Sequence, residues 1–142
     1  MQKKSEKAVI AFYDNQGRIL LQDRKGITKA GEEWGFFGGG IEPGETPEQA
    51  LIRELKEELD IDLKKVELLT QYKVFLPGDN LYNAIWLFVS PINIQIENLE
   101  QKEGRDMKFF TVDESRKLTM NKTDIDVIGK IKMYIKNKLE MV

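Results

Sequence analysis

The sequence predicts an α/β protein of the α+β kind, in which helices pack against one mixed β-sheet. Two observations lead to this prediction. Short segments rich in β-branched and aromatic residues alternate with turns that contain Gly, Pro or Asn. Residues 46–59 and 124–138 instead repeat apolar side chains at the spacing of an amphipathic helix. The length of 142 residues fits a single domain that spans residues 1–142.

The first strands form a predicted hairpin. Residues 8–13 and 18–22 are mostly apolar, and the Asp-Asn-Gln-Gly sequence between them is typical of a tight turn that ends on Gly17. A short strand at residues 34–37 leads directly into three consecutive glycines. These segments predict the first part of the sheet.

Three further strands are predicted at residues 66–75, 81–89 and 107–112. A short helix begins near Asp113, and residues 124–138 form the last helix. Its apolar stripe includes Val127, Ile128, Ile131 and Tyr134. We assign this stripe to core packing rather than to a partner site, because surface helices normally bury such a stripe.

Composition excludes several kinds of chemistry. The chain has no cysteine and no histidine, so carboxylates and lysines must carry any reaction. The net charge of −2 gives no reason to expect a nucleic-acid partner, whereas a small phosphorylated ligand needs only a local positive field. The N-terminus lacks the apolar region of a signal peptide, and no segment approaches a membrane span. We therefore expect a cytoplasmic protein without a membrane partner.

The segment 46–59 predicts a helix with an acidic face. Thr46 is a candidate N-cap, and Pro47 lies in the first turn, where proline is tolerated. Three carboxylates at i, i+3 and i+4 share one face: Glu54, Glu57 and Glu58. Three leucines spaced by four cover the opposite face: Leu51, Leu55 and Leu59.

Two explanations of the acidic face are open. A solvated charged face is the usual one. The alternative is a metal site, because the glycines at 38–40 just upstream allow backbone groups to approach a ligand closely. Clustered oxygen ligands of this kind suit Mg²⁺ or Mn²⁺, which bind through a few carboxylates and substrate phosphates. The combination favours the metal site and implies a phosphate substrate.

Residues 39–61 resemble the Nudix box of the Nudix hydrolases, Gly-x5-Glu-x7-Arg-Glu-U-x-Glu-Glu-x-Gly-U, where U is aliphatic. Eight of its nine specified positions match, and the segment 39–50 is most similar to the MutT-type branch of nucleoside triphosphate pyrophosphohydrolases. The departure is Asp60, which stands in place of the last glycine. Asp tolerates the left-handed conformation that a glycine supplies at a helix end, so we expect an altered cap and retained activity.

The resemblance implies a fold and a set of roles. The fold is an α/β/α sandwich around a mixed sheet, with the box as a loop-helix-loop motif. The implied metal ligands for Mg²⁺, with Mn²⁺ as an alternative, are the Gly38 carbonyl, Glu54, Glu57 and Glu58. Arg53 orients the neighbouring glutamate, while Glu45 secures the loop. The general base is either Glu57 or a later carboxylate, for which Glu103 is the best candidate.

Specificity residues lie outside the box. Arg24 and Phe36 fall where MutT-type enzymes contact the nucleotide, although each also suits an ordinary strand end or core position. Asn121 or Asp124 corresponds to residues that reach a purine edge in relatives, and both are also good N-caps. Pro77 has the spacing of a marker of ADP-ribose-cleaving relatives, but Pro-Gly is also an ordinary turn signal.

The predicted function is Mg²⁺-dependent hydrolysis of a phosphoanhydride in a nucleoside diphosphate linked to another moiety. The preferred substrate is a (deoxy)nucleoside triphosphate, including oxidised nucleotides such as 8-oxo-dGTP, which gives monophosphate and pyrophosphate. ADP-ribose or a nucleotide sugar is the alternative substrate. A nucleotide-binding module without catalysis is the alternative of another class, and the intact acidic helix argues against it. Both a monomer and a homodimer are compatible with the sequence.

Overall fold

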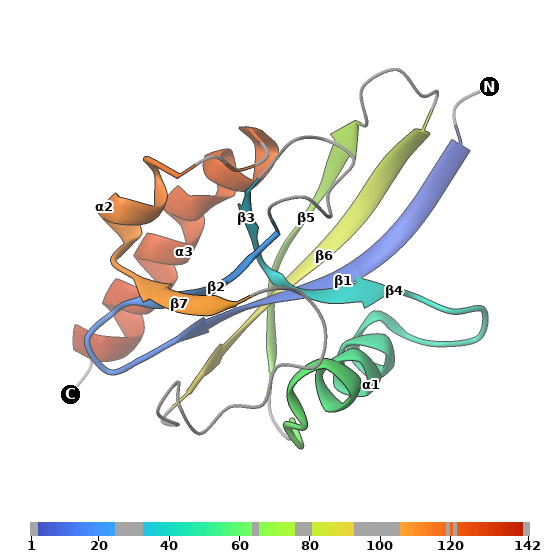
Figure 1. The fold of residues 1–142 in the computed structure, drawn as a ribbon, viewed down its shortest axis with the longest axis horizontal. Coiled ribbons are helices and arrows are strands. Elements are labelled where there is room, and N and C mark those ends of the chain that lie inside the picture. The colour runs from blue at the N-terminus through green and yellow to red at the C-terminus, as the bar shows by residue number, and fades with distance from the viewer. Residues whose placement is uncertain are drawn as a thin grey trace.

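The computed structural model describes residues 3–24, 33–63, 66–75, 81–92, 106–118, 120 and 122–140. Within these ranges seven strands form one sheet, and helices cover it (Figure 1). The strands are β1 (Lys3–Tyr13), β2 (Ile19–Asp23), β3 (Trp34–Gly35), β4 (Phe37–Gly40), β5 (Glu67–Phe75), β6 (Leu81–Pro91) and β7 (Met107–Phe110). The helices are α1 (Pro47–Leu59), α2 (Val112–Ser115) and α3 (Lys122–Glu140).

The sheet is mixed, as predicted. Its main order is β3-β2-β1-β6-β5, while β4 also pairs with β1 and β7 with β2. β1 lies parallel to β6 along its whole length and antiparallel to β2 and β4. Because β1 is bonded on both sides, it is the central strand that carries β4 and the loop before α1.

The predicted hairpin between β1 and β2 is confirmed. The Asp14 carboxylate accepts hydrogen bonds from the backbone N–H groups of Gln16 and Arg18 at 3.0 and 2.8 Å. Gly17 has a φ of 79°, a left-handed conformation that favours glycine. The side chain of Asp14 and the backbone of Gly17 therefore close this turn.

Two predicted strands differ from the structure. The segment 34–37 is not one strand, because β3 pairs with β2 whereas β4 pairs with β1, and the chain changes partner at Phe36. The buried Gln22 side chain donates to the Phe36 carbonyl at 2.9 Å and holds this change of direction. The strand expected to reach residue 112 ends at Phe110, because the Thr111 side chain caps α2 and accepts from the Glu114 N–H.

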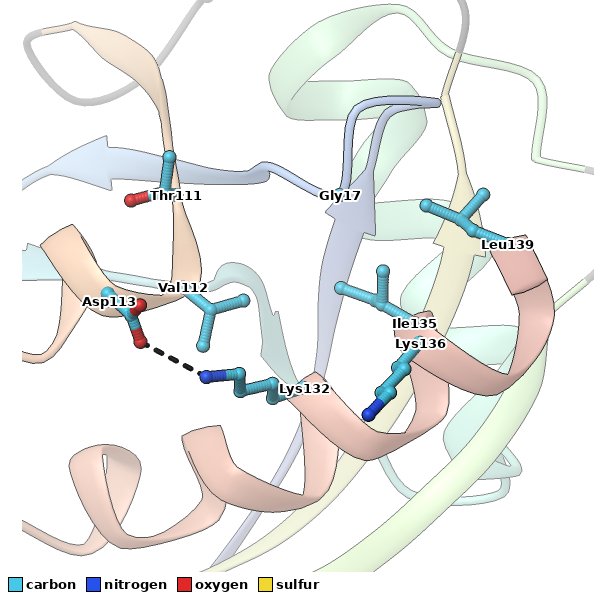
Figure 2. A pocket seen from close by; sticks show the side chains of 8 residues that line it. All are labelled: Gly17, Thr111, Val112, Asp113, Lys132, Ile135, Lys136 and Leu139. Atoms are coloured by element: carbon cyan, nitrogen blue, oxygen red, sulfur yellow. Dashed lines mark hydrogen bonds and ion pairs between the residues drawn. The ribbon is translucent and has the colours of Figure 1, made fainter.

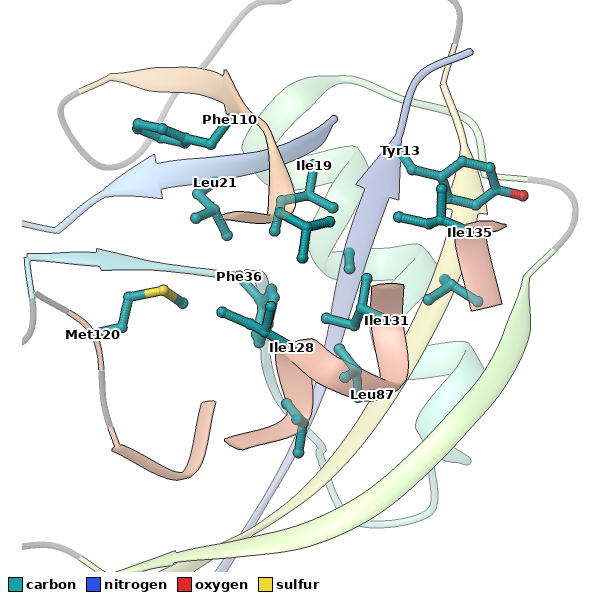
Figure 3. Packing of buried hydrophobic residues seen from close by; sticks show 14 residues of the cluster. Tyr13, Ile19, Leu21, Phe36, Leu87, Phe110, Met120, Ile128, Ile131 and Ile135 are labelled. Carbon is teal, nitrogen blue, oxygen red and sulfur yellow. The ribbon is translucent and has the colours of Figure 1, made fainter. Parts of the chain in front are cut away.

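Two apolar clusters lie on the two faces of the sheet. Ile10 and Phe12 of β1 pack with Leu51 and Leu55 of α1. The alternate residues of β1 belong to the second cluster, which contains the α3 residues Val127, Ile128, Ile131 and Ile135 (Figure 3). The sheet is thus sandwiched between α1 and α3, which confirms the expected architecture.

The helices of the described ranges include none that is both long enough and apolar enough to cross a bilayer.

Candidate active site

The start of α1 is fixed by a capping box. Thr46, the predicted N-cap, accepts a hydrogen bond from the Gln49 N–H at 3.1 Å, and the Gln49 side chain accepts from the Thr46 N–H at 2.9 Å. These bonds satisfy N–H groups that the helix leaves without internal partners. The predicted leucine stripe is buried against the sheet: Leu51, Leu55 and Leu59 are at most 2% exposed. Both the direction and the rotation of α1 are therefore set.

The end of α1 has a left-handed cap, so Asp60 keeps the conformation that glycine would supply where an altered cap was expected. Asp60 has φ 53° and ψ 36°, and it is the one non-glycine residue with positive φ in the described ranges. Its carboxylate lies 2.8 Å from the Lys56 ammonium, one turn earlier in the helix. Asp60 thus adopts the conformation of the missing glycine and adds an exposed ion pair.

Arg53 is the centre of the polar network on α1. Its guanidinium donates from Nε and Nη2 to the two oxygens of Glu45, at 2.9 Å each. Nη1 donates to Glu54 at 3.0 Å, and Nη2 also donates to the Gly40 carbonyl at 3.0 Å. One side chain therefore joins the strand end, the loop and the helix.

The pKa values reflect this network. Hydrogen bonds from Arg53, followed by a backbone hydrogen bond from Glu42, lower the pKa of Glu45 from 4.5 to about 2. The same pairing with Glu45 raises the pKa of Arg53 above its usual range. Both groups are charged at neutral pH, and a bidentate pair of this kind is geometrically specific. The network therefore fixes the positions of its members as well as their charges.

The Glu54 carboxylate packs directly against the backbone of Gly39. A Cβ atom at Gly39 would lie 2.6 Å from both carboxylate oxygens, closer than real Cβ atoms approach. Gly38 has a φ of 141°, and a Cβ there would collide with the Ala8 carbonyl. Glycine is thus required at 38 by the β1–β4 pairing, and a side chain at 39 would displace the Glu54 carboxylate.

The three predicted acidic ligands differ in environment. The side chain of Glu54 is 16% exposed, that of Glu57 is 54% exposed, and Glu58 is only 7% exposed. Glu57 lies 3.7 Å from Arg53 Nη1. The Glu58 atom Oε2 is buried and accepts no hydrogen bond, although the residue takes part in other interactions.

The donor chemistry fits a small hard cation. The predicted ligands offer only oxygen, from three carboxylates and the backbone carbonyl of Gly38, which is the donor type that Mg²⁺ and Mn²⁺ prefer. In the described ranges no three acidic side chains converge on one point. Glu54 is engaged by Arg53, while Glu57 extends toward solvent. The structure therefore places the three carboxylates on one turn of α1 without gathering them around a common centre.

The predicted specificity residues have separate locations. Arg24 follows β2, and its side chain lies against Gly35. Phe36 is 6% exposed and belongs to the core cluster on the α3 side of the sheet. Asp124 lies in the first turn of α3, where it accepts a hydrogen bond from the Tyr72 hydroxyl at 2.6 Å. The other predicted residues lie outside the described ranges: Glu103, Asn121 and Pro77.

Two residues that hold predicted site residues in place were not anticipated from the sequence. Gln22 holds the Phe36 carbonyl before the glycines, and Tyr72 holds Asp124. The alternation along β5 could have placed Tyr72 on the inner face, but nothing local identifies a partner 52 residues away.

A separate hollow of about 350 Å³ lies where the turn at Gly17 meets α2 and α3 (Figure 2). Val112, Ile135 and Leu139 form its apolar wall, and Lys132 pairs with Asp113 at 3.3 Å on its rim. None of the predicted site residues lines this hollow.

Comparison with known proteins identifies the family of this chain. A family profile described as the NUDIX domain matches residues 3–130. The chain is 40% identical over 102 residues to an 8-oxo-dGTP diphosphatase of Proteus vulgaris, a match that covers 72% of this chain and 88% of the relative. It is 35% identical over 78 residues to a CTP pyrophosphohydrolase of Escherichia coli K12, covering 55% of this chain and 58% of the relative.

Solved structures share the fold. The crystal structure of a MutT protein from Methanosarcina mazei Go1 superposes with a TM-score of 0.78 at 16% identity, covering 95% of this chain and 97% of the other.

Proposed function

Because this chain belongs to the NUDIX family, we propose that it hydrolyses a phosphoanhydride bond in a nucleoside diphosphate linked to another group. The preferred substrate in this proposal is a (deoxy)nucleoside triphosphate, which yields monophosphate and pyrophosphate. The observation that carries the proposal is the Arg53 network, which holds Glu54 over Gly39 and links the loop to the acidic turn of α1. A solvated charged face would need no such bidentate support.

The names of the relatives support a nucleotide substrate. They specify 8-oxo-dGTP in one case and CTP in the other. Both compounds are nucleoside triphosphates, and both bases carry an exocyclic amino group. The proposal therefore includes oxidised purine nucleotides and cytidine nucleotides as first candidates.

The proposed cofactor is a divalent cation, Mg²⁺ with Mn²⁺ as the alternative. The residues that would hold it are Glu54, Glu57, Glu58 and the Gly38 carbonyl. When bound, such an ion neutralises phosphate charge and lowers the pKa of a water molecule. This protein's own contribution is positioning: Arg53 orients Glu54, and Glu45 anchors Arg53.

Glu57 is the proposed proton acceptor. Its carboxylate is the most exposed of the three on the acidic turn, and it is held loosely, at 3.7 Å from Arg53. A carboxylate that accepts a proton from attacking water must be accessible to that water. Glu103 remains the alternative base in this proposal, and it lies outside the described ranges.

The test is a turnover panel with and without Mg²⁺ that detects pyrophosphate and phosphate separately. It includes canonical and oxidised nucleoside triphosphates, ADP-ribose, nucleotide sugars and dinucleoside polyphosphates. Metal-dependent release of pyrophosphate from a triphosphate supports the proposal. Preference for ADP-ribose would replace the substrate class, and nucleotide binding without turnover would indicate a non-catalytic module.

Glu57→Gln is the matching variant. We expect kcat to fall roughly 100-fold or more, with an unchanged melting temperature because the side chain is half exposed. Glu48→Gln, on an exposed part of the same helix, is the control and should retain activity. Wild-type turnover by Glu57→Gln would remove Glu57 from the proposed site.

A further inference from the structure

Three alternate backbone carbonyls point away from β1 along the outer edge of β4. The direction follows from the ladder, because the Ile41 N–H donates to the Glu6 carbonyl at 2.9 Å. In an antiparallel pair, hydrogen-bonded and non-bonded residues alternate, so every second residue turns its backbone groups away from the partner strand. Counted back from Ile41, these residues are Gly40, Gly38 and Phe36. Among the described strands β4 pairs only with β1, so no ladder takes up these three carbonyls.

The two outer carbonyls are held by side chains from other elements. The Phe36 carbonyl accepts a hydrogen bond from Gln22 Nε2 at 2.9 Å, and the Gly40 carbonyl accepts one from Arg53 Nη2 at 3.0 Å. Within the residues that the structure describes, no hydrogen bond reaches the carbonyl of Gly38. Alternate residues of a strand are about 7 Å apart. The free carbonyl therefore lies midway between two fixed ones.

Gln22 is well placed to fix the first of these carbonyls. Its side chain is buried, with 3% exposed. Its backbone lies opposite Gly35 of β3 and Met107 of β7, so β2 is paired on both sides at this residue. Phe36 directly follows Gly35 and is the residue at which the chain leaves β2 for β1. The bond from Gln22 thus ties this change of partner to a rigid part of the sheet.

Gly38 needs such support more than another residue would. Its φ of 141° is a conformation that side chains rarely adopt, and glycine has the widest freedom of backbone rotation. The direction of its carbonyl must therefore be set by the residues on either side. We propose that Gln22 is a positioning residue that, with Arg53 at the other end, holds the Gly38 carbonyl in place for the divalent cation. The inference rests on the cation site of the proposed function and adds a residue outside the box to its support.

The experiment measures Mn²⁺ binding to the protein without nucleotide, from the electron paramagnetic resonance signal of the free ion. Gln22→Met keeps the length of the side chain and removes its donor. Loss of a residue that orients a metal ligand costs 10- to 100-fold in affinity. We expect Kd for Mn²⁺ to rise about tenfold, the lower end of that range, because Gln22 acts through two residues of backbone. In assays of turnover, the Mg²⁺ concentration that gives half-maximal rate should rise, while kcat at saturating Mg²⁺ changes little.

Ser115→Ala is the matched control. It removes another buried bond from a side chain to a backbone carbonyl, the 2.6 Å bond from the Ser115 hydroxyl to Val112 in α2. Both variants lose a buried hydrogen bond, so both should melt at a lower temperature than the wild type. Only Gln22→Met should bind Mn²⁺ more weakly. Gln22→Asn is the second variant if Gln22→Met does not fold: it keeps an amide that is one methylene too short, and Mn²⁺ binding should again weaken.

The outcomes separate this inference from the proposed function. Weaker Mn²⁺ binding in the Gln22 variant, with wild-type binding in Ser115→Ala, supports the inference even if the turnover panel finds no substrate. Unchanged Mn²⁺ binding in the Gln22 variant, or an equal loss in Ser115→Ala, overturns it and leaves the bond a support of the fold alone. A wild-type protein that binds no Mn²⁺ also overturns it, even if triphosphates are hydrolysed.

Discussion

The two long helices, α1 and α3, bury similar apolar stripes but hold their polar sides differently. On α1, one arginine makes two bonds to Glu45 and further bonds to Glu54 and Gly40. On α3, Lys130, Lys132 and Lys138 each make one hydrogen bond or ion pair to another element, at 3.1 to 3.3 Å and between exposed groups. Apolar burial places a whole helix, whereas a bidentate network places individual side chains on it. We expect function to depend strongly on the Arg53 network and only weakly on these lysine contacts of α3.

Arg53→Lys tests this difference most strongly. Lysine keeps the charge but cannot bond Glu45, Glu54 and Gly40 together in one plane. We expect kcat/KM to fall about 100-fold or more, because small displacements of reacting groups carry that cost. The comparison variant on α3 is Lys132→Ala, which removes an exposed ion pair with Asp113 and should change activity less than twofold. Similar losses in both variants would show that the two helices do not differ in this way.

Gly39→Ala tests whether the position of the Glu54 carboxylate depends on the absence of a side chain at residue 39. The added methyl group would lie 2.6 Å from both carboxylate oxygens, so the Glu54 carboxylate must shift from its position beside Arg53 Nη1. We expect kcat to fall roughly tenfold or more on the usual scale of misplaced groups. Gly40→Ala is the matched control, since its Cβ would meet no atom within 4 Å. Steady-state kinetics of the two variants are compared side by side. An equal loss of kcat in both would contradict the role of Gly39 in positioning Glu54.

The charge on Glu45 predicts an acid-dependent contribution to stability. Its pKa in the folded protein is about 2, below the ordinary value of 4.5, because Arg53 bonds the carboxylate. The contribution is therefore present above pH 4.5 and is lost as the pH falls toward 2. In urea unfolding at successive pH values, the wild type should lose stability faster than Glu45→Gln between these limits. Parallel curves for the two proteins would show that the pair contributes nothing measurable.

The smallest expected effect concerns the end of α1. Asp60→Gly relieves the left-handed backbone but removes the ion pair with Lys56. Glycine adopts this conformation without strain, and exposed pairs contribute little, so we expect a gain of up to about 1 kcal/mol in unfolding free energy. Asp60→Asn separates the two causes, since it removes the charge and keeps a residue that tolerates positive φ. A lower melting temperature for Asp60→Gly would show that the ion pair is the stronger contribution.

Features that depend on residues close together in the sequence could be predicted. The leucine stripe, the Thr46 cap and the left-handed Asp60 all follow from patterns within one helix and its ends. The strands also follow from local composition, and the Nudix resemblance supplied the sandwich arrangement. Such features need no knowledge of which distant segment lies opposite.

Features that depend on tertiary contacts could not be predicted. The split at Phe36 arises because β1 and β2 pair with different parts of one segment. The burial of Glu58 depends on how closely α1 packs on the sheet, which the spacing of its carboxylates does not show. The bond between Tyr72 and Asp124 joins segments 52 residues apart. In each case the sequence shows the structural preference of the residue but not which distant segment lies beside it in the fold.

The parallel pairing of β1 with β6 also affects synthesis of the chain. β1 leaves the ribosome before its parallel partner, and its eleven-residue ladder with β6 is completed only when Leu81–Pro91 has emerged. Among the strands that the structure describes, β2 and β4 are the partners of β1 that are available before then. Long-range parallel pairing is intrinsically slow, and waiting strands are exposed to aggregation. The central strand of the finished sheet thus stays incompletely paired until β6 has been synthesised.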